Sequence, residues 1–186
     1  MEKTVNIIGA GLAGSEAALQ LASRGVRVRL YEMRPEVATA VHHGSDCAEL
    51  VCSNSLKSTK PESAAGMLKA ELSSLGSFLI AQAYANRVDA GGALAVDRDA
   101  FSAAVTRLVR EHPLIEYVVG EVSCPPTDAD AVVLATGPLT SDALASWIAQ
   151  RAGADNLAFF DAAAPIVMAD SLDESVLFRQ SRYEEQ

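Results

Sequence analysis

The amino-terminal segment joins two apolar patterns through a glycine-rich turn. Residues 4–8, TVNII, form a short continuous apolar run, and residues 26–32, VRVRLYE, alternate apolar and polar positions. Both patterns predict strands. Between them, GAGLAG at 9–14 opens a helical pattern that continues to about Arg24 and stops at Gly25. The sequence therefore begins with a predicted strand, turn, helix and strand.

The middle of the chain predicts a long loop followed by helices. Residues 33–60 are polar and have no clean period, which is typical of a functional loop. Residues 62–85 predict one or two helices with a break near Gly76. Asp97 is expected to cap a helix that runs to about Glu111. One face of that helix carries the apolar residues Phe101, Ala104, Val105, Leu108 and Val109, a predicted core stripe.

Two more strands are predicted towards the carboxyl end. LIEYVVGEV at 114–122 is strand-like, and ADAVVLATG at 129–137 predicts another buried strand that runs into a glycine turn. Thr140 is expected to cap a helix over 141–152. Strands that alternate with helices predict an α/β fold with a Rossmann-like arrangement that is incomplete at the carboxyl end.

Composition narrows the class of protein. The chain has 186 residues, 49% hydrophobic and 5% aromatic, enough for one domain with a core of small and aliphatic side chains. The net charge of −9 argues mildly against a nucleic-acid surface on this segment. Three cysteines, no signal-peptide pattern and no apolar run of membrane length predict a cytoplasmic protein with reduced thiols and no membrane contact.

The glycine turn is a candidate nucleotide site. Gly9, Gly11 and Gly14 form G-x-G-x-x-G after a predicted strand and before a predicted helix, the context that this motif requires. Gly9 would allow the tight turn, Gly11 would let a pyrophosphate approach, and Gly14 would let helix and strand pack closely. The free N–H groups at the helix start would then bind the phosphates. The alternative is a glycine turn that only joins strand to helix.

Two other positions refine this site. Glu32 ends the second strand, where a carboxylate would accept hydrogen bonds from a ribose diol and would repel a 2′-phosphate. The ATG turn at 135–137 resembles the turn that approaches the cofactor a second time in FAD domains of two-dinucleotide-binding flavoproteins. An ordinary strand-to-loop glycine is the alternative.

Cys52 lies in a polar run, AELVCSNSLKS at 48–58. Lys57 and neighbouring hydroxyls would lower the pKa of the thiol, and a thiolate can add to an electrophilic carbon. From the residues alone, a buried and inert cysteine is the commoner case. A metal site built from His42, His43 and the nearby cysteines is disfavoured, because the spacing matches no common zinc pattern. The two histidines are expected to lie near a ligand or to be exposed.

The run AGGALAVDRDAF at 90–101 has two compatible interpretations. Adjacent glycines followed by Asp97 and Arg98 suggest a backbone close to a ligand with a guanidinium in reach. The alternative is a Gly–Gly turn followed by an aspartate that caps a helix, which accounts for the same residues.

Several blocks together resemble a known family. NIIGAGLAGSEAALQLASRGVRVRLYEMRP, AELVCSNSLKS, AGGALAVDR, ATGPLTS, FFDAAAPIV and SRY occur in this order. They are similar to the bacterial folate- and FAD-dependent tRNA (uracil-5-)-methyltransferases of the TrmFO type, which are related to GidA. The resemblance implies C5-methylation of a T-loop uridine in tRNA, with methylenetetrahydrofolate as carbon donor, FAD as cofactor, and NADPH or NADH as reductant.

The resemblance also implies site residues and boundaries. Cys52 matches the first of two family cysteines and is expected to be catalytic. Cofactor binding is assigned to Gly9, Ala10, Gly11, Leu12, Ala13, Gly14, Glu32, Arg34, Arg98, Thr136 and Gly137. Residues 1–160 are expected to form a Rossmann-like FAD-binding domain, with 33–96 as an active-site loop and helical insertion and 161–186 as the start of a truncated second domain.

Family members are well over twice as long, so we expect an amino-terminal fragment with little or no methyl transfer of its own. Two other functions stay open from the sequence. One is a related FAD-dependent protein that modifies the wobble uridine of tRNA. The other is a non-catalytic module that binds FAD or NAD.

Overall fold

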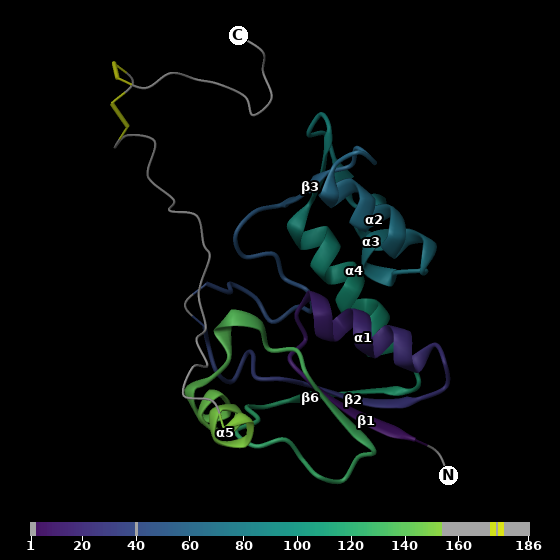
Figure 1. The fold of residues 1–186 in the computed structure, drawn as a ribbon, viewed down its shortest axis with the longest axis vertical. Helices are drawn as coiled ribbons and strands as arrows, with labels where there is room; N and C mark the ends of the chain where they lie inside the picture. Colours follow the sequence, from purple (N-terminus) through teal and green to yellow (C-terminus); the bar gives the residue numbers. More distant parts are fainter. Residues whose placement is uncertain (1–2, 40, 154–171, 174, 177–186) are drawn as a thin grey trace.

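The computed structural model describes residues 3–39, 41–153, 172–173 and 175–176 of the chain, which fold around two sheets (Figure 1). The larger sheet is parallel and consists of β1 (Thr4–Ile8), β2 (Arg27–Glu32), β6 (Ile115–Val119) and β7 (Ala131–Leu134). The smaller sheet is antiparallel and consists of β3 (Ser55–Ser58), β4 (Arg87–Val88) and β5 (Ala93–Val96). The predicted α/β class is confirmed.

The parallel sheet has the strand order β6-β2-β1-β7. Ile8 at the end of β1 lies opposite Tyr31 and Leu134, and Glu32 lies opposite Val119. The carboxyl ends of all four strands therefore meet at one edge of the sheet. The chain runs outward from β1 through β2 to β6 and then returns to the other side of β1 as β7. Ligands of doubly wound sheets bind at such a reversal of strand order.

Helix α1 (Leu12–Ala22) follows β1 and lies across the sheet (Figure 1). Helix α4 (Arg98–Glu111) begins at Asp97, whose side chain accepts a hydrogen bond from the N–H of Ala100 at 3.0 Å. The predicted stripe on α4 is confirmed, because Phe101, Val105 and Val109 lie in the same core cluster as the sheet, Leu108 packs against that cluster, and Ala104 is buried. The predicted aspartate cap is confirmed as well.

Helices α2 (Ala64–Ser74) and α3 (Phe78–Ala85) lie beside the antiparallel sheet at the far end from β1 and β2 (Figure 1). They are separated at Gly76, which has a φ of 74°, so the predicted break is confirmed. Within the described residues, every helix is too short or too polar to span a bilayer.

Three local predictions are wrong. Residues 33–60 contain the strand β3, which sequence patterning misses because its residues Ser-Leu-Lys-Ser have no fully buried face. Strand β7 is not buried: Val132 and Leu134 are 41% and 40% exposed, because β7 forms an edge of the sheet.

The third correction concerns the cap of α5 (Asp142–Ala152), which is Ser141 rather than Thr140. A short 3₁₀ turn, η1 (Gly137–Leu139), ends at Thr140 and displaces the helix start by one residue. The predicted domain boundary near residue 160, the block FFDAAAPIV and the final SRY lie outside the described residues.

Candidate functional site

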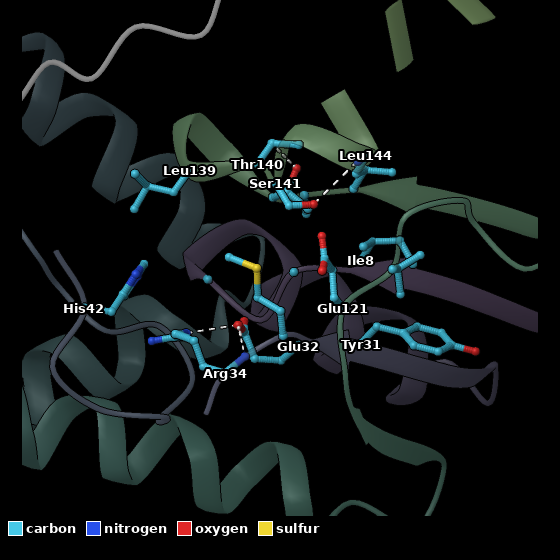
Figure 2. Close-up of a pocket in the computed structure, with 16 residues that line it drawn as sticks. Ile8, Tyr31, Glu32, Arg34, His42, Glu121, Leu139, Thr140, Ser141 and Leu144 are labelled. Carbon is cyan, nitrogen blue, oxygen red and sulfur yellow. Dashed lines mark hydrogen bonds and ion pairs between the residues drawn. The ribbon is translucent and has the colours of Figure 1, made fainter. Parts of the chain in front are cut away.

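A pocket opens where the carboxyl ends of the parallel strands meet (Figure 2). Its walls come from the glycine turn after β1, from residues 31–34 at the end of β2, and from residues 121–122 after β6. Residues 135–144, which follow β7, and His42 complete it. Four segments far apart in the sequence thus share one site at the switch point of the sheet.

The glycine turn has the geometry that its three glycines predict. Gly9 has a φ of 100°, a left-handed conformation, and a Cβ there would lie 2.7 Å from the carbonyl oxygen of Ala135. A Cβ on Gly14 would lie 1.8 Å from the carbonyl oxygen of Gly9. At Gly11, in contrast, a Cβ would meet no heavy atom within 4 Å. Two glycines are required by the fold, and the third faces open space at the pocket.

The start of α1 offers unpaired backbone donors to that space. Gly11 is the residue before the helix, and no described side chain caps it. The first N–H groups of a helix lack intrahelical partners and carry a partial positive charge. A phosphate group placed against Gly11 would satisfy these donors.

Glu32 is buried, with 6% exposure, and is directed at the glycine turn. Its Oε2 accepts a hydrogen bond from the N–H of Ala10 at 3.0 Å, and its Oε1 accepts from the N–H and the Nε of Arg34 at 3.1 and 2.9 Å. Burial raises the pKa of Glu32, but these hydrogen bonds and the charge of Arg34 outweigh burial and hold the pKa below its usual value. Since each carboxylate oxygen can accept about two hydrogen bonds, Oε2 keeps room for one more donor.

Arg34 lines the pocket but is already engaged by the protein. In addition to Glu32, it donates to the carboxylate of Glu49 at 2.8 Å and to the carbonyl oxygens of Gly44 and Asp46. It is 3% exposed. Arg34 therefore ties the loop 44–49 to the end of β2, and its predicted contact with a cofactor stays a prediction.

His42 is a pocket residue that sequence reasoning left out of the site (Figure 2). Its Nδ1 lies 2.7 Å from the hydroxyl of Thr39. Burial, followed by the charge of Arg34, lowers the pKa of His42. His43 next to it is exposed and does not line the pocket. The pair of histidines was a visible signal, but the sequence could not indicate which of them turns inward.

The other predicted cofactor residues fall into two groups. Thr136 lines the pocket, Ala10 and Gly137 belong to turns that frame it, and Leu12 and Ala13 form the first residues of α1. Arg98 is not in the pocket lining. Glu121, Thr140 and Ser141 also line it; no cofactor contact was predicted for them, although Thr140 and Ser141 belong to the ATGPLTS block.

Cys52 lies outside the pocket lining, on an exposed bend. The chain is anchored on both sides of it. Arg98 donates from Nη1 to the carbonyl oxygen of Leu50 at 3.4 Å, and Asn54 pairs with Val96 through two hydrogen bonds. An accessible thiol held between fixed points is compatible with a nucleophile, and the interpretation of Cys52 as a buried cysteine is wrong. Cys47 is the fully buried thiol, with 0% exposure.

Among the described residues, no three His, Cys, Asp or Glu side chains gather into a possible metal site. The polar groups of the pocket are instead typical of a nucleotide-binding site. The pocket combines uncapped helix N–H groups, free space at Gly11 and a carboxylate with one open acceptor position. The residues present fit the ADP portion of a dinucleotide.

Comparisons with known proteins identify the family to which this chain is similar. A family model described as Glucose inhibited division protein A matches residues 4–186. The methylenetetrahydrofolate--tRNA-(uracil-5-)-methyltransferase TrmFO of Rhodopseudomonas palustris (strain BisB18) is 58% identical over 98% of this chain and 39% of its own length. The protein of the same name from Deinococcus radiodurans is 52% identical, again over 98% of this chain and 39% of its own length. The chain thus spans about two-fifths of the length of these curated relatives.

Among solved structures, the Y270F mutant of MHPCO has a TM-score of 0.49 and 16% sequence identity, covering 77% of this chain and 42% of its own. The open form of the Tyr258Phe mutant of NikD, described as an unusual amino acid oxidase, has a TM-score of 0.43 and 17% identity, covering 74% and 52%.

Proposed function

The chain belongs to the glucose inhibited division protein A family, and from this premise we propose that its pocket binds FAD through the ADP portion. The observation that carries the proposal is the junction of β1 and α1. There an uncapped helix start, open space at Gly11 and the carboxylate of Glu32 lie together. The helix N–H groups would hold the diphosphate, and Oε2 of Glu32 would accept a hydrogen bond from the ribose.

Binding is tested with the purified chain. We expect it to carry a yellow flavin, or to bind added FAD with a shift in the visible spectrum. Gly11→Ala, which places a methyl group in the open space, should abolish binding. A colourless chain that binds NAD and not FAD would contradict the proposal and favour a nicotinamide-binding module.

We further propose that this site serves C5-methylation of uridine in tRNA, the activity that the names of the 52–58% identical relatives state. Methylenetetrahydrofolate would donate the carbon, and NADPH or NADH would supply the reducing equivalents. FAD, when bound, supplies the electrons that reduce the transferred carbon to a methyl group. We also propose the cytoplasm as the location of this reaction.

Cys52 is the nucleophile in this proposal. Its thiolate would add to C6 of uracil, and the displaced electron pair would make C5 nucleophilic enough to attack the one-carbon unit; loss of the C5 proton would then expel the thiolate and restore the C5–C6 double bond. Exposure of Cys52 on an anchored bend supports this role.

The nucleophile is tested in a chimera, because the chain spans only part of its relatives. The corresponding segment of the Rhodopseudomonas palustris protein is replaced with this chain, and methylation of a tRNA transcript is measured. Cys52→Ala should abolish methyl transfer, whereas Cys124→Ala, at another exposed cysteine, should leave it unchanged. Unchanged methylation by the Cys52→Ala chimera would remove Cys52 from the mechanism.

A further inference from the structure

We propose that His42 donates a hydrogen bond from Nε2–H to a diphosphate oxygen of the bound nucleotide. The inference rests on the proposed function of the pocket and assigns a role that the glycine motif does not cover. Figure 2 shows His42 on the same side of the pocket as Arg34 and Leu139, with its ring turned away from the Arg34–Glu32 ion pair.

The charge balance of the pocket calls for such a donor. Two carboxylates, Glu32 and Glu121, line the pocket and would repel a diphosphate. Among the described residues, Arg34 is the one Lys or Arg side chain in the lining, and its guanidinium is committed to Glu32, Glu49 and two backbone carbonyls. The start of α1 therefore needs support from a different side chain.

Besides Arg34, the side-chain donors of the lining are Tyr31, Thr136, Thr140, Ser141 and His42, and Figure 2 shows the Tyr31 hydroxyl directed away from the other labelled side chains. The hydroxyls of Thr136 and Thr140 lie 2.5 Å apart, and Thr140 also donates to the carbonyl oxygen of Gly137. Ser141 caps α5. His42 is engaged through Nδ1, so Nε2 is the ring atom available to a ligand.

The hydrogen bonds around Thr39 favour one tautomer of His42. The Thr39 hydroxyl accepts a hydrogen bond from the N–H of His42 at 3.1 Å. The hydroxyl also lies 2.7 Å from Nδ1 of His42, and we take the hydroxyl as the donor of this second hydrogen bond. With Nδ1 as acceptor, the neutral imidazole carries its proton on Nε2, facing outward as a donor.

The neutral ring is the form expected at pH 7. Burial lowers the pKa of His42, and the charges of Arg34 and His43 lower it further against the opposing effect of Glu49 and Glu32. The Nε2–H donor would therefore be present without titration of the ring.

The experiment measures the dissociation constants of ADP and adenosine by calorimetry on the whole chain. We expect His42→Ala to weaken ADP binding about tenfold or more, because hydrogen bonds to charged groups are worth more than neutral ones. Adenosine, which lacks the diphosphate, should bind both proteins equally. His43→Ala is the matched control, since its exposed neighbouring ring should leave ADP binding unchanged.

Two further variants separate a direct contact from a structural effect. His42→Gln keeps a side-chain N–H donor and should recover part of the affinity for ADP. Thr39→Val removes the hydroxyl that favours this tautomer and should weaken ADP binding about threefold. Urea unfolding of each variant checks that the fold is retained.

Equal ADP affinity in the wild type and in His42→Ala would overturn the inference, as would an equal loss for ADP and adenosine. A wild-type chain that binds neither ADP nor FAD would overturn the proposed function itself. The two failures are therefore distinguishable.

Discussion

At the scale of single residues, Glu32 connects the glycine turn to the loop that follows β2. It holds the N–H of Ala10 with one oxygen and Arg34 with the other, and Arg34 in turn holds Glu49. A buried charge of this kind is stable only when its partners remain in place. The position that would accept a ribose is thus also a structural support of the turn that would hold the phosphates.

Replacement of Glu32 by Gln should therefore change stability and its dependence on pH. Because the folded pKa of Glu32 is lowered, its contribution is present above the unfolded value of about 4.3 and is lost as pH falls through the folded pKa. Glu32→Gln should lower the free energy of unfolding at pH 7 by about 3 kcal/mol, the lower end for a broken buried pair, because Arg34 keeps Glu49.

Urea unfolding between about pH 3 and pH 7 measures this effect, and the variant should show a flatter profile below about pH 4.5. Glu36→Gln is the control, since Glu36 is exposed and should change stability by less than about 0.5 kcal/mol. If the free energy of unfolding changed with pH in the same way for the wild type and for Glu32→Gln, the hydrogen bonds to the Glu32 carboxylate would not stabilise its charged form.

The glycines of the turn should separate folding from binding. Gly14→Ala forces a methyl group against the carbonyl of Gly9, and we expect a loss of about 1–3 kcal/mol or more in the free energy of unfolding. Gly11→Ala meets no neighbour and should change stability by less than about 1 kcal/mol.

For ADP binding, in contrast to stability, we expect Gly11→Ala to be the more damaging of the two substitutions. Gly11→Ala should weaken it more than tenfold, because the methyl group occupies the space assigned to the diphosphate. Denaturant unfolding and calorimetry on the same preparations test both statements. Tight ADP binding by Gly11→Ala would place the ligand elsewhere.

Residues with a backbone role were predictable, and residues brought together by tertiary structure were not. The spacing of Gly9, Gly11 and Gly14 after an apolar run carries its own structural meaning. Whether His42 or His43 turns into the pocket depends on contacts of the loop with Arg34 and Thr39, which no local pattern encodes.

At the scale of elements, a side chain of α1 fixes the start of α3. The carboxylate of Glu16 accepts hydrogen bonds from the hydroxyl of Ser77 at 3.0 Å and from the N–H groups of Phe78 and Leu79 at 3.2 and 2.9 Å. It satisfies helix donors in the same way as a cap, but from a distant part of the sequence.

We expect Glu16→Ala to lower the free energy of unfolding by about 1–2 kcal/mol, the range for loss of a helix cap. Hydrogen exchange should accelerate in the first turn of α3. Glu71→Ala on the exposed face of α2 is the control, because its side chain has no partner within the described residues. Equal urea midpoints for the wild type and Glu16→Ala would show that Ser77 alone suffices as the cap.

Periodicity located the helices and central strands because each buries one face against the core. It failed for β3, which is short and polar, and it misjudged β7, which lies at a sheet edge. β7 is exposed because the strand order puts it at an edge of the sheet. Its sequence, AVVL, is equally typical of a central strand, so the sequence alone does not distinguish the two positions.

At the scale of the whole molecule, the strand order assembles the pocket from turns that follow β1, β2, β6 and β7. A nucleotide in this pocket would touch turns from the whole width of the parallel sheet. A ligand that binds only the folded state raises the free energy of unfolding. The increase is about 2.7 kcal/mol when the ligand concentration is 100 times the dissociation constant.

Thermal unfolding with added nucleotides should therefore report both the site and its selectivity. ADP should raise the unfolding temperature, whereas 2′,5′-ADP should have little effect, because its 2′-phosphate would meet the buried carboxylate of Glu32. We expect at least a tenfold difference in affinity, or about 1.4 kcal/mol. Equal stabilisation by the two nucleotides would mean that Glu32 does not face the ribose, and the orientation of the nucleotide in the pocket would have to be reversed.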